Sequence, residues 1–267
     1  MSGLHIGDYR RLMPVARPPL SAVLITHDAA AQLPACLDSL DFCAEIVVVD
    51  SGSQDGGVEL AHLRGARVIQ ADWRGFGAQK QFAVAQAKNN WVLCVDADER
   101  VSLELRESIL QALASPDRLA YRFPRCNRFL GRYLRHGEGY PDWSLRLFDR
   151  RNARWSDDAV HEKVLTEAAV GDLRGDLLHD SAETLNAYLA KQDRYTTLAA
   201  QQAHAAGQRA HVGHLLLSPL LRFMKFYILR LGFLDGIAGL VHILIGCGNS
   251  FVKYAKMLDL QTREETD

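Results

Sequence analysis

Short apolar runs alternate with helix-like stretches along the chain from Leu20 onward. The runs have the length of buried strands, and the apolar residues between them recur at helical spacing. Strands that alternate with helices are typical of a mostly parallel sheet, so we expect an α/β fold. The predicted strands are residues 22–26, 46–50, 68–69 and 91–96, and the predicted helices lie around Pro34, over 58–63 and from Gly75 to about Lys88.

The pattern changes in the second half of the chain. Two more strands are predicted there, at 121–127 and 144–148, joined by a loop rich in glycine and aromatic residues. A helix is expected over 181–206, because Asp180 and Glu183 have the spacing of a capping box. We therefore divide the chain into an N-terminal arm (1–19), a first half of the α/β domain (20–115), a second half (116–206) and a C-terminal segment (207–267).

The C-terminal segment combines basic and apolar residues. Between Gly207 and Lys256 the local charge is +5, since six Lys or Arg residues are opposed only by Asp235. A helix is expected to begin at Ser218 and Pro219, which are a favourable cap and first position. That helix gathers three basic side chains on one face, Arg222, Lys225 and Arg230. The opposite face carries aromatic and aliphatic side chains.

A basic face opposite an apolar face favours the interface of a membrane that contains anionic lipid. The alternative is that these helices pack against the rest of the chain or against a second subunit. The uncharged run 236–252 reaches about the lower length limit for a membrane span. It contains four glycines together with His242, Asn249 and Ser250. We therefore expect a peripheral segment and not a spanning one.

The composition narrows the classes of protein. Hydrophobic residues make up 48% of the chain and charged residues 24%, as in an ordinary soluble domain. A net charge of −1 gives no reason to expect nucleic acid as a partner. The five cysteines are odd in number and have no metal-site or redox spacing, which indicates a reduced, cytoplasmic protein. The arm has no apolar core long enough for a signal peptide.

Polar residues stand where three of the predicted strands end. Thr26, Asp50 and Asp96 each close an apolar run, and Asp98 follows two residues later. In open α/β sheets, ligands bind along this edge. Residues at i and i+2 of an extended segment point the same way, so both carboxylates of the Asp-Ala-Asp motif are expected to face one ligand. Hard divalent cations such as Mg²⁺ or Mn²⁺ prefer carboxylate and phosphate oxygens, although a solvated acidic turn would show the same three letters.

At this point the chain resembles the family 2 glycosyltransferases of the GT-A fold. The segments that carry the resemblance are SAVLITHDAAAQLPACLDSL, EIVVVDSGSQDGG, GFGAQKQFAVAQAKNNWVLCVDADE and YPDWSLRLF, which cover about half of the chain in the expected order. AVHEKV, LLHDS and GFLDGIAGL resemble a narrower group that contains bacterial lipopolysaccharide core β-glucosyltransferases. The resemblance implies a Rossmann-like nucleotide-binding half, an acceptor half and a mostly parallel mixed sheet, followed by C-terminal amphipathic helices.

The resemblance also implies roles for single residues. Asp50 would accept a hydrogen bond from a uracil ring, Asp96 would face the ribose, and Asp98 would bind the metal. His161 is a candidate third metal ligand or diphosphate contact, with a purely structural histidine as the alternative. Lys80 would border the sugar or diphosphate, unless it is a solvated surface lysine. The implied nucleotide-sugar site is Thr26, His27, Asp50, Lys80, Asp96 and Arg146, where Arg146 could instead form a salt bridge within the acceptor half.

The general base is less well defined by the resemblance. Family members commonly carry a Glu-Asp pair where this chain has Pro141 and Asp142. Asp142 lies directly before a predicted strand and would take the proton from the acceptor hydroxyl. Because the pair is incomplete, Glu138 and Glu162 remain alternatives.

These expectations combine into one function. The resemblance implies an inverting, metal-dependent transfer of a hexose, with glucose as the expected sugar, from a UDP-sugar to a lipid-linked saccharide such as the lipopolysaccharide core. The enzyme would be cytoplasmic and peripheral on the inner face of the cytoplasmic membrane, and it could form a homo-oligomer. A GT-A-like nucleotidyltransferase is one alternative, although the first strand is not followed by a glycine-rich basic signature. A non-catalytic scaffold at a membrane surface is the other.

Overall fold

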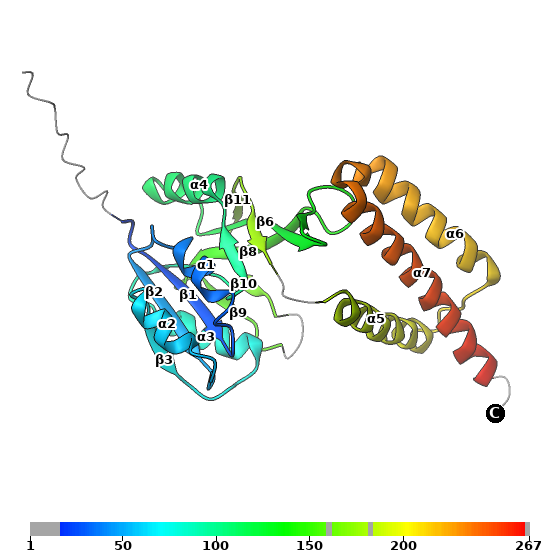
Figure 1. The fold of residues 1–267 in the computed structure, drawn as a ribbon, viewed down its shortest axis with the longest axis horizontal. Coiled ribbons are helices and arrows are strands. Elements are labelled where there is room, and N and C mark those ends of the chain that lie inside the picture. Colours follow the sequence, from blue (N-terminus) through cyan, green and yellow to red (C-terminus); the bar gives the residue numbers. More distant parts are fainter. Residues whose placement is uncertain (1–16, 159–161, 181–183, 265–267) are drawn as a thin grey trace, which may run out of the picture.

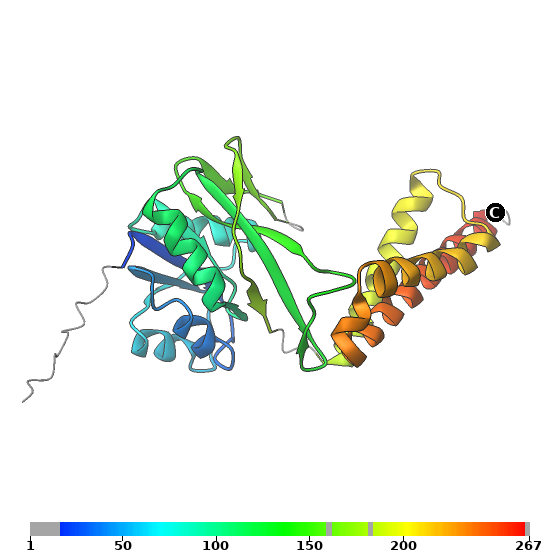
Figure 2. The same ribbon diagram turned by 90° about the horizontal axis from the view of Figure 1, so that it is seen from above.

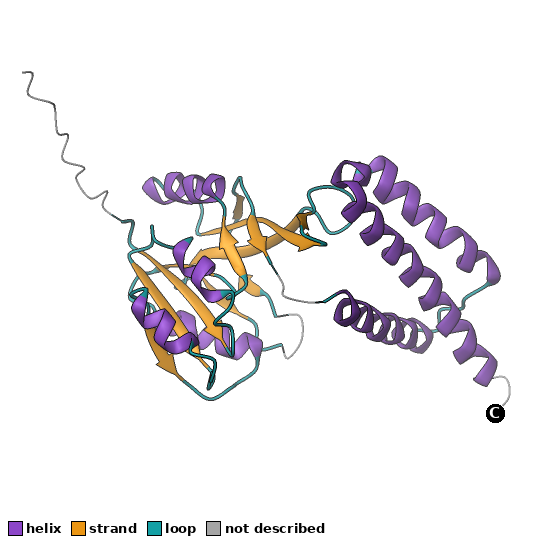
Figure 3. Cartoon of the chain, viewed as in Figure 1, coloured by secondary structure: helices purple, strands orange, loops and turns teal. Residues whose placement is uncertain are grey.

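The computed structural model describes residues 17–158, 162–180 and 184–264. A curved sheet with helices on both faces forms one part of the molecule, and a group of helices projects from it (Figure 1). Figure 3 shows that the projecting part contains helices and loops only. The predicted architecture, a mostly parallel mixed sheet followed by C-terminal helices, is therefore confirmed.

Ten strands form the main sheet, in the order β3-β2-β1-β4-β8-β6-β12-β5, with β7 and β11 paired to β6. A short antiparallel pair, β9 (Ala153–Trp155) and β10 (Val164–Thr166), lies outside it. The strands of the main sheet are β1 (Leu20–Thr26), β2 (Glu45–Asp50), β3 (Arg67–Gln70), β4 (Trp91–Cys94), β5 (Glu99–Val101), β6 (Ala120–Phe129), β7 (Arg132–Tyr133), β8 (Asp142–Asp149), β11 (Val170–Asp172) and β12 (Leu177–His179).

Helices cover the sheet and form the projecting part. The helices on the sheet are α1 (Leu33–Asp38), α2 (Gly57–Leu63), α3 (Phe76–Gln86) and α4 (Leu103–Ala114). The projecting helices are α5 (Leu185–Ala205), α6 (Val212–Phe223), the π-helix η1 (Met224–Leu229), the 3₁₀ helix η2 (Gly232–Asp235) and α7 (Gly236–Glu264).

Strand direction changes at the middle of the sheet. The strands β3, β2, β1 and β4 run parallel, as expected for the first half of the domain. The strand β8 is antiparallel both to β4 and to β6, while β12 runs parallel to β6 and antiparallel to β5. The carboxyl ends of β1, β2 and β4 therefore lie near the start of β8 and the end of β12, which brings residues from both halves to one edge.

The apolar runs form a core on each face of the sheet. On one face, Leu24 and Leu93 pack with residues of α1, α2 and α4. On the other face, Val23 and Val92 pack with α3 and with Trp155 of β9. Adjacent residues of one strand point to opposite faces, so both faces of the central strands are buried. This explains why these strands appear in the sequence as continuous apolar runs.

Two predicted helix starts are wrong. The side chain of Thr184 caps α5 by accepting a hydrogen bond from the Ala187 N–H at 3.2 Å, so Asp180 is not the cap; its expected partner Glu183 lies outside the described residues. The helix predicted to start at Ser218 and Pro219 instead starts at Val212 and contains Pro219. Pro219 removes one backbone hydrogen bond, but the helix continues through it to Phe223.

Candidate active site

Asp50 is a buried residue at the end of β2, and its carboxylate holds the loop that follows. Thr26 Oγ1 donates to Asp50 Oδ1 at 3.2 Å, and the Ser53 hydroxyl donates to the same oxygen. The backbone N–H groups of Gly52 and Ser53 each donate to Asp50 Oδ2 at 3.0 Å. Both oxygens therefore have two donors already. The carboxylate is thus engaged within the loop, and the hydrogen bond expected from a uracil ring to Asp50 stays a prediction.

The loops after β1 and β2 are tied to each other by side chains. Asp28 Oδ1 accepts from the Gln54 N–H at 2.8 Å, and the Asp28 N–H donates to Ser53 Oγ at 2.9 Å. Asp55 Oδ2 accepts from the Ala30 N–H at 2.7 Å. This backbone hydrogen bond, partly opposed by desolvation, lowers the pKa of Asp55 below its usual value. We call the two loops, residues 27–30 and 51–55, the laced loops.

The laced loops carry His27, a contact residue expected from the sequence. They also carry Ser51, which contacts Gln79 of α3; the sequence suggested neither of these two residues. His27 is exposed at their rim, with Nδ1 3.1 Å from the Ser51 carbonyl oxygen. Gln79 of α3 is fully buried and donates from Nε2 to Ser51 Oγ at 3.0 Å. Its Oε1 is buried without a hydrogen-bond partner among the described residues. Ser51 therefore adds a polar side chain at the end of β2, held by the buried Gln79.

Lys80 of α3 lies in the site and is not a surface lysine. It is only 7% exposed, and its Nζ lies 3.1 Å from Asp96 Oδ1 and 3.0 Å from Glu162 Oε1. The ammonium also stands over the ring of Trp155, 4.8 Å from the ring centroid. Arg146 of β8 approaches the same aspartate from the other side, with Nη2 3.1 Å from Asp96 Oδ2. Two buried cations thus converge on Asp96.

These cations determine the protonation state of Asp96. Burial alone would raise the pKa of the carboxyl group, but Arg146 and Lys80 outweigh it and hold the pKa well below its usual range. Asp96 is therefore ionised at neutral pH. The Nη1 atom of Arg146 is buried and has no hydrogen-bond partner among the described residues, so this guanidinium retains a donor for an anionic ligand.

The Asp-Ala-Asp motif lies in a turn between β4 and β5, and not in an extended strand as predicted. The Glu99 N–H donates to the Asp96 carbonyl oxygen at 2.9 Å, and Glu99 Oε2 accepts from the Asp96 N–H at 2.9 Å, so Glu99 closes the turn. The two motif carboxylates have different partners as a result. Asp96 contacts cations of α3 and β8, while Asp98 contacts His179 of β12.

Asp98 and His179 form the part of the site that is suited to a metal ion. His179 Nε2 lies 3.1 Å from Asp98 Oδ2, and Nδ1 lies 2.7 Å from Asn127 Oδ1. The Asn127 oxygen also accepts from Arg125 Nη1 at 3.3 Å, which fixes the orientation of the amide. An amide oxygen only accepts, so His179 donates from Nδ1 and directs Nε2 at the carboxylate. Nε2 and the Asp98 carboxylate both present lone pairs to each other, so a cation or a second proton on the imidazole is required between the two atoms. A histidine oriented in this way is typical of metal sites.

The residues present fit a hard divalent cation that takes few protein ligands. Among the described residues there is no group of three or more His, Cys, Asp or Glu side chains that could hold a metal. A shell of Asp98, His179, diphosphate oxygens and water would suit Mg²⁺ or Mn²⁺, which bind such mixed sets. His161, the histidine chosen from the sequence, lies outside the described residues, so its role stays a prediction; the histidine that the structure places beside Asp98 is His179.

Asp142, at the start of β8, is the most accessible of the three candidate bases. Its side chain is 47% exposed, and the nearest cation is Arg125, whose Nη1 lies 4.0 Å from Asp142 Oδ2. Glu162 is paired with Lys80. Glu138 is paired with Arg222, whose Nε lies 3.1 Å from Glu138 Oε2. Asp142 is therefore the carboxylate best placed to receive a proton from a ligand that arrives from solvent.

Strand register brings the metal-binding pair and Asp142 to the same edge. Arg125 of β6 pairs with Asp142 of β8, and Asn127 of β6 pairs with His179 of β12. Arg125 Nε also donates to the buried Glu99 at 2.6 Å. A continuous set of contacts thus runs from Asp142 through Arg125 and Asn127 to His179 and Asp98.

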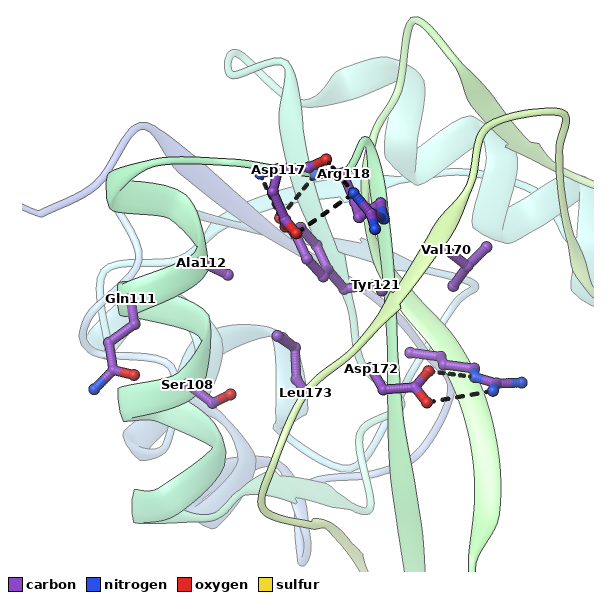
Figure 4. Close-up of a pocket in the computed structure, with 11 residues that line it drawn as sticks. Ser108, Gln111, Ala112, Asp117, Arg118, Tyr121, Val170, Asp172 and Leu173 are labelled. Atoms are coloured by element: carbon purple, nitrogen blue, oxygen red, sulfur yellow. Dashed lines mark hydrogen bonds and ion pairs between the residues drawn. The ribbon is translucent and has the colours of Figure 1, made fainter.

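A cavity of the sheet domain lies elsewhere and is not part of this site. It has a volume of about 530 Å³ and lies between α4 and the strands β6 and β11, as Figure 4 shows. Its charged side chains pair with one another, since Arg122 Nε lies 2.7 Å from Asp172 Oδ1. None of the candidate site residues lines it.

We expect the replacement of Gly77 by alanine to destabilise the protein, because α3 packs closely at this glycine against Ser156, the residue after β9. A Cβ atom there would overlap the carbonyl oxygen of Ser156. The expected loss is about 1–3 kcal/mol of unfolding free energy, measured by urea denaturation. Gly248→Ala in α7 is the matched control, because a Cβ atom there would meet nothing within 4 Å outside the local turn of its own helix. This variant should be neutral or stabilise by about 0.5–1 kcal/mol. Equal stability of the two variants would contradict the close contact at Gly77.

Comparison with known proteins shows similarity to glycosyltransferases. Residues 21–170 match the sequence model of the family described as Glycosyl transferase family 2. The lipopolysaccharide core biosynthesis glycosyltransferase LpsC of Rhizobium meliloti (strain 1021) is 33% identical over 251 residues, which cover 91% of this chain and 93% of the relative. An uncharacterized glycosyltransferase of Rickettsia prowazekii (strain Madrid E), RP128, is 26% identical over 92% of this chain and 89% of its own.

Among solved structures, similarity is lower. Glucosyl-3-phosphoglycerate synthase from Mycobacterium tuberculosis, in complex with Mn²⁺, UDP and glucosyl-3-phosphoglycerate, matches 42% of this chain and 44% of its own. The TM-score is 0.35 and the sequence identity is 22%, so this match carries no argument about the site. The family match and the full-length relative show that the GT-A fold and glycosyltransferase activity expected from the sequence are correct. The chain belongs to glycosyl transferase family 2.

Proposed function

We propose that this glycosyltransferase is metal dependent and moves a hexose, with glucose as the expected sugar, from a UDP-sugar to a saccharide carried on a lipid. The observation that carries the proposal is the placement of the Asp98–His179 pair and Asp142 along one edge of the sheet. One group can hold a metal with the donor diphosphate, and the other can accept a proton from the acceptor. The relative LpsC, named for lipopolysaccharide core biosynthesis, supports a lipid-linked saccharide such as the lipopolysaccharide core as acceptor.

The donor would bind across the ends of β1, β2 and β4. The laced loops, which begin with Ser51 after β2, offer polar atoms for the nucleoside, and the buried Gln79 holds the Ser51 hydroxyl from behind. Lys80 and Arg146 are buried cations beside Asp96 and suit the diphosphate, where exchange of ion-pair partners keeps the buried charges compensated. A metal ion held by Asp98 and His179 would neutralise charge on the leaving diphosphate.

The acceptor half would supply the base. Asp142 takes the proton of the acceptor hydroxyl while the hydroxyl oxygen forms a bond with the anomeric carbon. The bond between that carbon and the diphosphate oxygen breaks, and UDP leaves with the bonding electron pair. A single displacement of this kind inverts the anomeric configuration. Only one free carboxylate is needed for it, which agrees with the ion pairing of Glu138 and Glu162.

A transfer assay with a panel of nucleotide sugars tests the proposal. With a lipid-linked oligosaccharide as acceptor, we expect a product from UDP-glucose in Mn²⁺ or Mg²⁺ and none after addition of EDTA. Slow hydrolysis of the same donor should occur without acceptor. Activity that is unaffected by the chelator would overturn the metal assignment, and a preference for a non-uridine donor would overturn the nucleotide assignment.

We further propose that the enzyme works as a peripheral protein at the inner face of the cytoplasmic membrane. Two helical segments, Val212–Leu229 and Gly232–Glu264, are long and apolar enough to cross a membrane by length and composition. The sequence suggested that Arg222, Lys225 and Arg230 bind an anionic membrane surface. In the structure, however, two of these three residues have partners within the chain. Arg222 pairs with Glu138, and Arg230 Nη1 donates to the Tyr140 carbonyl oxygen at 3.2 Å.

A further inference from the structure

The outward face of α6 and η1 is apolar along its whole length. No residue of α6 is buried, and none of the segment Val212–Leu229 is enclosed by the rest of the chain. The exposed side chains recur every three or four residues, so they form one stripe on the helix. They are Val212, Leu216, Leu217, Leu220, Leu221, Met224 and Ile228.

The stripe continues around the end of the hairpin that α6 and α7 form. Phe233 and Leu234 of η2 and Ile237 of α7 are exposed there. Figures 1 and 2 show that α6 and α7 run side by side and project from the sheet domain in both views. Contiguous apolar surface of this extent is rare on soluble monomers and marks an interaction surface. We call this surface, from Val212 to Ile237, the hairpin face.

The charges beside the hairpin face identify the kind of partner. Lys225 and Lys253 pair with no carboxylate among the described residues, and each stands over an aromatic ring, Phe226 and Tyr254 respectively. A positive border around an apolar face is complementary to anionic phospholipid headgroups above acyl chains. A second copy of this chain would bring the same positive charge to the contact.

Polar contacts hold α7 against the rest of the protein. Asn249 Nδ2 donates to Gln192 Oε1 of α5 at 2.8 Å, and Lys256 Nζ lies 2.6 Å from Asp193 Oδ1. Arg222 Nη1 donates to Ser250 Oγ at 3.2 Å. Crossing a bilayer would require α7 to break these contacts in a medium that offers no replacement. The arrangement suits a hairpin that lies in one leaflet.

The hairpin is also bonded to the loop that leads to Asp142. Asp235 of η2 is buried, and its Oδ2 accepts from the backbone N–H groups of Arg135 at 2.9 Å and His136 at 2.8 Å. The Gly137 N–H donates to the Arg230 carbonyl oxygen at 2.9 Å. The segment 135–141, which ends next to the proposed base, is therefore fixed to the hairpin.

We infer that the hairpin face inserts into one leaflet of a bilayer mainly by apolar contact, and that it holds Asp142 at the height of the headgroups. The second part rests on the proposed function, because Asp142 acts there on a lipid-linked acceptor. Docking of this kind resists salt, unlike the weak electrostatic binding that the basic residues in the sequence suggested. The hairpin of α6 and α7 lies in the membrane surface, and the sheet domain remains in water.

Flotation of the full-length protein with vesicles tests the inference. The wild type should float with phosphatidylcholine vesicles and with vesicles that contain phosphatidylglycerol. It should stay bound in 1 M salt, where the Debye length is about 3 Å and electrostatic attraction is screened. Leu217→Glu combined with Leu221→Glu should reduce partitioning by about tenfold for each leucine removed. Leu63→Glu with Leu103→Glu is the matched control, since these leucines are as exposed but lie on the sheet domain.

The outcomes separate this inference from the proposed function. Hydrolysis of UDP-glucose without vesicles should be the same in the wild type and in both double variants. Wild-type protein that hydrolyses UDP-glucose but does not float would overturn the inference alone, whereas protein that floats without using any UDP-sugar would overturn the proposed function alone. Release of the wild type by salt, or equal loss in the control, would also overturn the inference. So would a hairpin variant that floats normally but changes from dimer to monomer in sedimentation.

Discussion

Replacement of Asp142 by asparagine is expected to lower the turnover of acceptor glycosylation by about 10²–10⁴-fold, the usual contribution of a general base. Asparagine keeps the size of the side chain but cannot take the acceptor proton. Affinity for UDP should change little, because a general base acts on the acceptor and not on the nucleotide. The measurements are initial rates with the lipid-linked acceptor and calorimetry with UDP.

Glu162→Gln and Glu138→Gln are the controls for this prediction. Each removes a carboxylate that is already paired with a cation, so turnover should fall much less than in Asp142→Asn. Wild-type turnover in Asp142→Asn, together with inactivity of either glutamine variant, would move the base to that glutamate.

Replacement of His179 by alanine is expected to remove the metal dependence of UDP binding. The imidazole is one of two protein side chains that could hold the ion, and its loss leaves Asp98 alone. We expect UDP affinity in Mn²⁺ to fall to the level that the wild type shows in EDTA. Asp98→Ala should have the same effect, and the two substitutions combined should be no worse than either, because both remove the same interaction.

Asn127→Ala provides a graded test of the same site. Asn127 does not contact the ion in this assignment but orients His179 through the 2.7 Å hydrogen bond. Loss of such a partner typically lowers metal affinity by about 10–100-fold. Calorimetry with Mn²⁺ and UDP measures all three variants. If His179→Ala retains wild-type affinity in Mn²⁺, the metal is held elsewhere, and His161 becomes the residue to test.

The sheet and its functional edge could be predicted from the sequence because local patterns determine them. The apolar runs that end at Thr26 and Asp50 became β1 and β2, and the pairing of these strands places both residues at one edge. The run that ends in the Asp-Ala-Asp motif also became a strand, although β4 stops at Cys94. Lys80 was placed beside the donor by resemblance; the structure buries it next to Asp96, and its contact with the donor stays a prediction.

The partners of these residues could not be predicted, because they depend on contacts between distant segments. His179 lies 81 positions after Asp98 in the sequence, and only the pairing of β12 with β5 and β6 brings them together. The segment LLHDS held the signal, but a histidine beside a strand has no distinguishing local pattern. Arg222 was expected to face lipid, and its contact with Glu138 spans 84 positions. Helical periodicity shows which residues share a face, but not what that face meets.

The laced loops have a consequence for the kinetics of donor binding. Their backbone is held by Asp28, Asp50 and Asp55 without any ligand. Fixing a residue costs about 1–2 kcal/mol of conformational entropy, and here folding has already met that cost. With the donor placed as proposed, an arriving nucleoside would find its contacts in place, and no loop would have to close first. We therefore expect association of UDP to be a single fast phase whose rate rises linearly with concentration, while differences in affinity among uridine nucleotides appear in their rates of departure.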